Sequence, residues 1–203
     1  CTNANSIGVE ICSTNSTGKM QNANDKSYSF TPAAVANAAQ LVKKIMAEYE
    51  VEKKIERKPR ILVTGCPIGG ATEKVIRAIE DNGGVVVTYE NCSGAKSIDK
   101  LVDEDNPDVY DALARRYLDI GCSVMTPNPN RLDLLGRLID EYKVDGVVEV
   151  VLQACHTYNV ESLGIRRFVN EKKGIPYIAV ETDYSQADIG QLNTRLTAFI
   201  EML

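Results

Sequence analysis

The chain of 203 residues has no tryptophan, a single histidine and only three phenylalanines. Without tryptophan it has no indole to anchor it at a membrane interface, and no apolar run approaches the ~18 residues that cross a bilayer. It also lacks a basic stripe interleaved with aromatic residues, and its net charge is −5 at pH 7. These absences exclude a membrane span and argue against binding to nucleic acid.

Close cysteine pairs are absent too, because none of the six cysteines forms a Cys-x-x-Cys motif. That absence argues against a zinc knuckle and against a thioredoxin-like dithiol. Disulfides are the alternative use of six cysteines. However, a hydrophobic content of 44% builds a core that needs no disulfide, and α/β domains of this kind are mostly intracellular. We therefore expect reduced, functional thiols in a cytoplasmic protein.

The chain begins at Cys1 instead of methionine. It is either a fragment of a longer protein or a processed lipoprotein whose first cysteine carries the lipid, and we favour the fragment. Residues 1–29, which include Cys12, are polar and poor in apolar side chains. Such a segment cannot offset its ordering entropy by burial. We expect residues 1–30 to be irregular or disordered.

A long helix is expected next. Thr31 is suited to the N-cap, with Pro32 at the first helical position. The helical pattern continues to about residue 55, so we expect residues 31–58 to form a connector helix that covers the sheet. The main domain then occupies residues 59–203.

Four apolar segments alternate with amphipathic helices in this domain. The pattern predicts an α/β fold with a doubly wound parallel sheet of about four strands, covered on both faces as three α/β/α layers. Right-handed crossovers favour the strand order 2-1-3-4. The expected strands are residues 60–64, 85–89, 146–152 and 177–180, and the expected helices are residues 71–82, 109–120, 131–142, 160–173 and 189–202.

Cys66, Cys92 and Cys155 each fall just past an expected strand. Because the carboxyl ends of parallel strands meet at one edge of a sheet, we expect the three thiols to be neighbours. Three soft sulfur donors suit a metal, and wide spacing suits an iron–sulfur cubane better than zinc. Taken singly, Cys66 is better explained as a small packed side chain, and for Cys155 packing and ligation are equally plausible. Cys92 lies in a polar turn, where burial against apolar side chains is a weaker explanation for a cysteine.

The loop after the first strand contains Cys66, Gly69 and Gly70 and opens a helix. A helix N-terminus lowers the pKa of a nearby thiol, so we expect Cys66 to be a thiolate. The loop is neither Gly-x-Gly-x-x-Gly nor a P-loop, and phosphate binding is only weakly indicated. Close approach to a bulky cluster fits the glycines better. Gly69, Gly70 and Asn91 are therefore the expected cofactor contacts.

Other chemistry-bearing residues lie near the same edge. Cys122 follows a helix instead of a strand, so a structural role is expected, with cluster contact as the alternative. A lone histidine is usually scaffold, but His156 follows Cys155 and is the candidate proton donor. Carboxylates with a potential role in positioning a substrate or bridging to another domain are Glu149, Glu161, Glu181 and Asp183.

The motifs at the strand ends read Gly-Cys-Pro-Ile-Gly-Gly-Ala-Thr-Glu-Lys-Val-Ile (65–76), Tyr-Glu-Asn-Cys-Ser-Gly (89–94) and Asp-Gly-Val-Val-Glu-Val-Val-Leu-Gln-Ala-Cys-His-Thr-Tyr-Asn-Val-Glu (145–161). With residues 175–192, these stretches resemble the 2-hydroxyacyl-CoA dehydratase and benzoyl-CoA reductase superfamily. More narrowly, they are similar to its double-cubane cluster proteins. The resemblance covers about residues 59–203 and leaves out residues 1–29.

The resemblance implies two flavodoxin-like domains with an iron–sulfur cluster, [4Fe-4S] or double-cubane, between them. This chain would be the C-terminal half, without the N-terminal domain, and Cys66, Cys92 and Cys155 would be its cluster ligands. It also implies an oxygen-sensitive homodimer that receives low-potential electrons from an ATP-hydrolysing activator with its own iron–sulfur cluster. Members of the family read Gly-Cys-Ser-Cys where this chain has Gly-Cys122-Ser-Val, which leaves the role of Cys122 open.

The expected function is thus an iron–sulfur reductase acting on a small molecule, with this fragment inactive alone. One alternative is a subunit of a 2-hydroxyacyl-CoA dehydratase, in which one electron forms a ketyl radical. The other is a non-enzymatic flavodoxin-like binding domain with inert cysteines.

Overall fold

The structure is a computed structural model that describes residues 32–52, 57–66, 69–125 and 127–203. It divides into two units, residues 1–57 and residues 58–203. The described element of the first unit is helix α1 (Pro32–Glu52), which confirms the expected long helix up to Glu52. The expectations for residues 1–30 and for the Thr31 cap lie outside the described residues. The role of α1 as a cover for the sheet stays a prediction.

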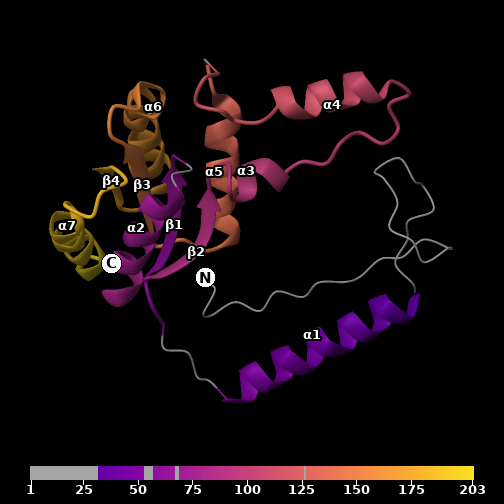
Figure 1. The fold of residues 1–203 in the computed structure, drawn as a ribbon, viewed down its shortest axis with the longest axis horizontal. Coiled ribbons are helices and arrows are strands. Elements are labelled where there is room, and N and C mark those ends of the chain that lie inside the picture. Colours follow the sequence, from indigo (N-terminus) through magenta and orange to yellow (C-terminus); the bar gives the residue numbers. More distant parts are fainter. Residues whose placement is uncertain (1–31, 53–56, 67–68, 126) are drawn as a thin grey trace. The chain divides into compact units, whose positions relative to one another are not determined.

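The second unit is built on a parallel sheet with the strand order β2-β1-β3-β4 (Figure 1). The order matches the expected 2-1-3-4. The two inner strands are buried along almost their whole length, which explains their unbroken apolar sequences. The strands are β1 (Arg60–Gly65), β2 (Val85–Glu90), β3 (Gly146–Leu152) and β4 (Tyr177–Thr182).

Helices cover both faces of the sheet, as expected for a flavodoxin-like three-layer fold. Apolar side chains of α2 and α7 form the core on one face, and those of α5, α6 and η1 form it on the other. None of the described helices is both long enough and apolar enough to span a membrane. The helices are α2 (Gly69–Asp81), α3 (Ala95–Ile98), α4 (Val109–Leu118), α5 (Pro129–Glu141), α6 (His156–Arg167), its π-helical continuation η1 (Phe168–Lys173) and α7 (Ile189–Glu201).

Two elements differ from the expectation, and both shape the edge where the strands end. The short helix α3 lies in a connection that has no strong helical pattern. Helix α6 begins at His156, four residues earlier than the expected start at residue 160. Ala154 takes a positive φ of 64°, so the chain turns sharply after β3 and the helix starts at once. Cys155 is consequently the N-cap of α6 and not a loop residue.

Candidate functional site

The end of β1 lies unusually close to β3. Gly65 has a φ of +107°, and a Cβ on it would lie 2.1 Å from the carbonyl oxygen of Val150. Only glycine permits this approach. The next residue, Cys66, donates its backbone N–H to the same carbonyl at 2.8 Å, and its Sγ accepts a hydrogen bond from the N–H of Leu152 at 3.3 Å. The backbone therefore holds Cys66 against the end of β3.

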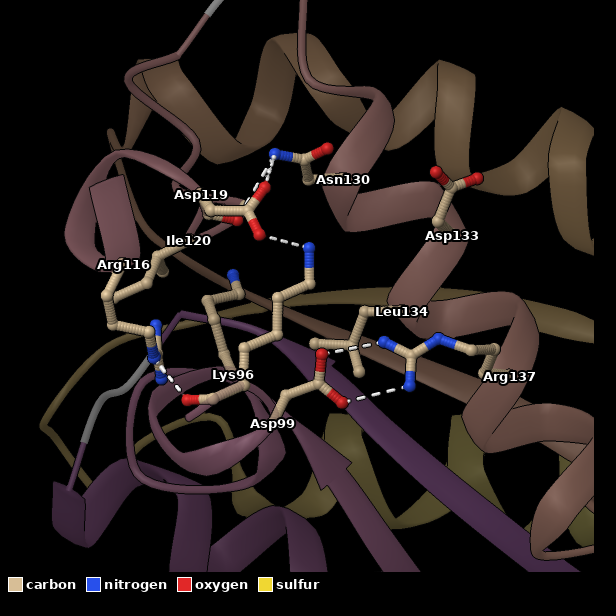
Figure 2. Close-up of a pocket in the computed structure, with 11 residues that line it drawn as sticks. Lys96, Asp99, Arg116, Asp119, Ile120, Asn130, Asp133, Leu134 and Arg137 are labelled. Carbon is tan, nitrogen blue, oxygen red and sulfur yellow. Dashed lines mark hydrogen bonds and ion pairs between the residues drawn. The ribbon is translucent and has the colours of Figure 1, made fainter. Parts of the chain in front are cut away.

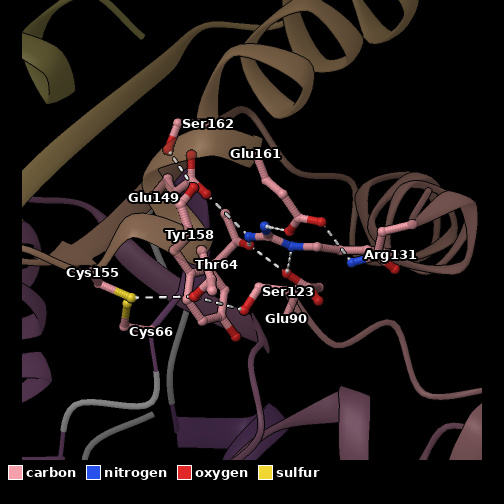
Figure 3. A network of polar contacts seen from close by, with 12 residues as sticks. Thr64, Cys66, Glu90, Ser123, Arg131, Glu149, Cys155, Tyr158, Glu161 and Ser162 are labelled. Carbon is pink, nitrogen blue, oxygen red and sulfur yellow. Dashed lines mark hydrogen bonds and ion pairs between the residues drawn. The ribbon is translucent and has the colours of Figure 1, made fainter. Parts of the chain in front are cut away.

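This placement brings Cys66 beside Cys155. The two thiols lie within hydrogen-bonding reach of each other, and Figure 3 shows their sulfur atoms as neighbours. The Cys155 Sγ also lies 3.5 Å from Oγ1 of Thr157, in the first turn of α6. The structure thus brings together two of the three thiols that were expected to meet. Their role as metal ligands stays a prediction.

The third thiol, Cys92, lies on an exposed turn after β2. Asn91 shapes this turn, because its side-chain oxygen accepts a hydrogen bond from the N–H of Ser93 at 3.0 Å. Burial and then the charge of Cys92 raise the pKa of the Tyr158 phenol, which places Cys92 within electrostatic range of α6. Across the described part of the chain, no three His, Cys, Asp or Glu side chains stand close enough to hold a metal ion. Cys92 is not gathered with the other two thiols.

The two neighbouring thiols differ in acidity. Burial raises the pKa of Cys66 to about 11, so the expectation of a thiolate at Cys66 is wrong. Loss of solvation there outweighs the nearby helix N-terminus. Burial also disfavours ionisation of Cys155, but hydrogen bonds from Thr157 and the N–H of Tyr158 outweigh it and lower its pKa. Cys155 is the thiol that the start of a helix activates.

The expected cofactor contacts fall into two places. Gly69 and Asn91 line one cavity of about 270 Å³, together with Tyr89 of β2. Gly70 lines a different cavity along α2. Neither glycine has an atom within 4 Å of the position that a Cβ would take, so both leave open space at the strand ends. Their contact with a cofactor stays a prediction.

His156 and Cys122 both lie near the start of α6. His156 is its first residue and is exposed, and its role as a proton donor is untested. Cys122 is half-buried, and its carbonyl oxygen accepts a hydrogen bond from Nδ2 of Asn128 at 2.9 Å. The adjacent Ser123 donates its hydroxyl to Oγ1 of Thr157 at 3.4 Å. The Cys122 loop therefore reaches the turn that carries Cys155, and the role of the Cys122 thiol stays open.

A buried ionic network, which the sequence reasoning missed, adjoins the thiols (Figure 3). Its centre is Arg131 of α5, with a side chain 1% exposed. Arg131 donates hydrogen bonds to Glu149 at 3.0 Å and to Glu161 at 2.6 Å, and its Nε lies 3.3 Å from Glu90 Oε2. Lys96 of α3 lies 3.0 Å from the other oxygen of Glu90. Two cations and three carboxylates thus meet here, and the third carboxylate, Glu161, is partly exposed to solvent.

Tyr158 connects this network to the thiols. Its ring lies 4.9 Å from the Arg131 guanidinium carbon and 5.4 Å from Lys96 Nζ, measured to the ring centroid. Such distances are typical of cation–π contacts. Burial, and then the charge of Glu149, raise the pKa of Tyr177, so its hydroxyl donates a hydrogen bond to Glu149. Arg131 also donates a hydrogen bond to Oγ1 of Thr64 in β1 at 3.1 Å. The network therefore joins α3, α5 and α6 to all four strands, beside the turn that carries Cys155.

The four candidate carboxylates have different surroundings. Glu149 and Glu161 both bind Arg131, so they are engaged within the protein. Glu181 is exposed at the end of β4. Asp183 lies 3.9 Å from Nζ of Lys74, a contact that fixes the loop after β4. A role for Glu181 or Asp183 in substrate positioning or bridging stays a prediction.

The sequence model of the family described as 2-hydroxyglutaryl-CoA dehydratase, D-component, matches residues 15–203. The chain belongs to this family. Among curated proteins, it is 60% identical over 160 residues to "Putative dehydratase subunit YjiM" of Escherichia coli (strain K12), which covers 79% of this chain and 42% of that protein. The membership agrees with the resemblance noted in the motifs around Cys66, Cys92 and Cys155.

Two more distant relatives carry other names. A benzoyl-CoA reductase subunit of Thauera aromatica is 26% identical over 154 residues, covering 73% of this chain and 34% of that protein. The (R)-phenyllactyl-CoA dehydratase beta subunit of Clostridium sporogenes is 26% identical over 167 residues, covering 80% of this chain and 43% of that protein. The chain therefore spans less than half the length of these curated relatives of the 2-hydroxyglutaryl-CoA dehydratase family.

Proposed function

We propose that this chain is the cluster-binding part of an iron–sulfur reductase of the 2-hydroxyglutaryl-CoA dehydratase family. Cys66, Cys92 and Cys155 would hold a [4Fe-4S] or double-cubane cluster. The observation that carries the proposal is the adjacency of the Cys66 and Cys155 thiols, which come from residues far apart in sequence. Such clusters are held by cysteine thiolates.

The donor set at the strand ends fits this role. The lowered pKa of Cys155 favours the thiolate form that ligation requires. Cys66 releases its proton on binding, which a positively charged iron centre promotes. Cys92 lies on an exposed turn, and ligation would require its thiol to move toward the pair. The remaining ligands would come from the N-terminal domain expected in longer members of the family.

The cluster, when bound, supplies low-potential electrons, and the residues of this chain supply position and exclusion of water. An ATP-hydrolysing activator with its own iron–sulfur cluster delivers the electrons to a homodimer in the cytoplasm. His156, exposed beside Cys155, gives a proton to a small-molecule substrate. Gly69 and Asn91 line the space that the cofactor would occupy. Gly70, which lines a different cavity, would contact the cofactor from the first turn of α2.

A second candidate function is favoured by the relatives' names, because two of the three are dehydratases or dehydratase subunits. In that case the protein is a subunit of a 2-hydroxyacyl-CoA dehydratase, and electron donation starts a loss of water with no net reduction. The two functions differ in the electrons consumed for each product molecule. If far less than one equivalent of reductant is consumed for each product molecule, the protein is a dehydratase subunit. If reductant is consumed in proportion to the product formed, the protein is a reductase.

The cluster itself is tested first. The natural full-length protein is reconstituted under anaerobic conditions with ferrous iron and sulfide, and both elements are measured per chain. We expect bound iron and sulfide together with the visible absorption of thiolate-ligated iron. A protein that binds no iron under these conditions overturns the proposal and favours a flavodoxin-like binding domain with inert cysteines.

A further inference from the structure

Tyr158, in the first turn of α6, acts on all three candidate ligands. Its backbone N–H donates a hydrogen bond to the Cys155 thiol, and its side chain lies in the same buried core as Cys66 (Figure 3). Burial raises the pKa of its phenol, and the charges of Cys92 and of Cys66 raise it further. The hydroxyl therefore lies within electrostatic range of both of these sulfur atoms. Tyr158 is thus placed to influence whatever the three thiols bind.

The hydroxyl of Tyr158 accepts one hydrogen bond and has a proton left to donate. Lys96 donates to Tyr158 Oη over 3.4 Å, because a lysine ammonium carries donors only. Within the described part of the chain, the phenol proton has no acceptor. The nearby oxygen Oε1 of Glu90 does not receive it, since that oxygen has no hydrogen-bond partner. A buried donor without an acceptor costs free energy, and Tyr158 is only 6% exposed, so its hydroxyl calls for an explanation.

Lys96 and the phenol ring are both held in place. Lys96 belongs to α3, and Asp99 at the end of this helix accepts two hydrogen bonds from Arg137 of α5, at 3.0 and 2.6 Å (Figure 2). The ring of Tyr158 makes cation–π contacts, 5.4 Å from Lys96 Nζ and 4.9 Å from the guanidinium carbon of Arg131. The phenol is therefore fixed, with its proton directed away from the lysine.

The turn that carries Cys92 leaves the buried network and rejoins it beside this phenol. Glu90 comes two residues before Cys92 and lies 3.3 Å from Nε of Arg131. Lys96 comes four residues after Cys92 and donates to the phenol oxygen. Cys92 itself is exposed between these two anchored positions. After burial, the charge of Cys92 is the largest cause of the raised pKa of Tyr158, so Cys92 is the acceptor that the turn presents to the phenol.

We propose that the Tyr158 hydroxyl donates a hydrogen bond to Cys92 Sγ in the cluster-bound protein and thereby raises the reduction potential of the cluster. Hydrogen bonds to the sulfur atoms are among the factors that set the potential of an iron–sulfur cluster. A donor at the sulfur stabilises the added negative charge of the reduced state. Lys96 acts through the phenol, as a positioning residue. The inference rests on the proposed function, because it requires a cluster at Cys92.

The first test uses Tyr158→Phe, which keeps the ring between its two cations and removes only the hydroxyl. The natural full-length protein is reconstituted with ferrous iron and sulfide under anaerobic conditions, and its reduction is titrated by electron paramagnetic resonance. We expect wild-type iron per chain and a reduction equilibrium that is roughly threefold to tenfold less favourable, where tenfold is about 59 mV for one electron. An unchanged potential at full iron content overturns the inference and leaves the cluster assignment standing.

Tyr177→Phe is the matched control for this titration. It also removes a phenol hydroxyl from the same network, but that hydroxyl donates to Glu149. We expect Tyr177→Phe to keep the wild-type potential. Equal shifts in the two variants would mean that loosening of the network moves the potential, and they would overturn the hydrogen bond to Cys92.

A second measurement detects the proton directly. Pulsed electron paramagnetic resonance of the reduced protein, in ordinary and in deuterated water, records the exchangeable hydrogens coupled to the cluster. We expect wild type and Tyr177→Phe to share a coupling that Tyr158→Phe lacks. Identical couplings in all three proteins overturn the inference alone. A wild-type protein that binds no iron overturns the proposed function and this inference together, so the two failures are distinguishable.

Discussion

Arg131 donates a hydrogen bond to Glu149 over 3.0 Å at a place where the Arg131 side chain is 1% exposed and the Glu149 side chain is fully buried. Removing the cation leaves buried carboxylates without compensation. We expect Arg131→Met to lower the free energy of unfolding by about 3–5 kcal/mol. Chemical denaturation monitored by circular dichroism measures the change.

The control for this prediction is an exposed ion pair on the same helix. Arg137 pairs with Asp99 at 2.6 Å and is 55% exposed, so Arg137→Met should cost no more than about 1 kcal/mol. Equal losses in the two variants would show that the buried network contributes no more than a surface ion pair.

The cysteines allow a second prediction. We expect Cys66→Ser, Cys92→Ser and Cys155→Ser each to reduce the iron bound per chain in the reconstituted full-length protein. A serine hydroxyl is a poor substitute for a soft thiolate donor. Cys122→Ser is the matched comparison, because Cys122 is half-buried and follows a helix. Full iron retention in the Cys66 or Cys155 variant would contradict the ligand assignment.

The close approach of β1 to β3 gives a third prediction. Gly65→Ala forces a Cβ into the carbonyl of Val150 and strains a positive φ, so we expect a loss of roughly 2 kcal/mol or more of stability. Gly164→Ala, in α6 with open space around the added Cβ, should instead stabilise by about 0.5–1 kcal/mol. Thermal unfolding of both variants checks the difference. If Gly65→Ala does not lower the stability, β1 and β3 can move apart to accommodate the added Cβ.

A fourth prediction concerns the stability that Asp188 contributes at low pH. Burial opposes ionisation of Asp188, but hydrogen bonds from Lys74 and Thr182, each 2.5 Å, hold its pKa below the usual 3.8. A lowered pKa in the folded state means that the unfolded state binds more protons in acid. The stability that Asp188 contributes is therefore present above the unfolded-state pKa and declines as the pH falls through the folded-state pKa.

The stability difference between wild type and Asp188→Asn should consequently be constant above about pH 5 and shrink below pH 4. Urea titrations at a series of pH values measure it. Lys74→Met should remove the same acid-dependent part, because Lys74 is the cation that stabilises the carboxylate. A difference that persists unchanged in acid would show that the Asp188 pKa is not lowered.

The fold could be predicted from the sequence largely because its signals are local. Each strand is a short apolar run, and each long helix repeats its apolar residues at helical intervals. Right-handed crossovers favour the order β2-β1-β3-β4 without fixing it, and the structure has that order. The start of α6 was missed because it depends on the positive φ of Ala154, which a non-glycine residue rarely takes. Helix α3 is too short to show a period.

The candidate site was less predictable, because it depends on tertiary contacts. Arg131 and Glu90 are 41 residues apart, and nothing near either one indicates the other. One signal was available: Glu149 stands between valines in a buried strand, and a carboxylate there requires a cation. The pKa of Cys66 was misjudged for a related reason, since its burial depends on strands and helices that the local sequence does not specify.

Gly65 determines how closely the Cys66 backbone approaches the end of β3. With no side chain between β1 and β3, the backbone of Cys66 is held against the end of β3, so the χ1 angles of Cys66 and Cys155 are what remains to set the distance between their sulfur atoms. A substitution at position 65 would therefore displace the Cys66 thiol from Cys155 without changing either cysteine.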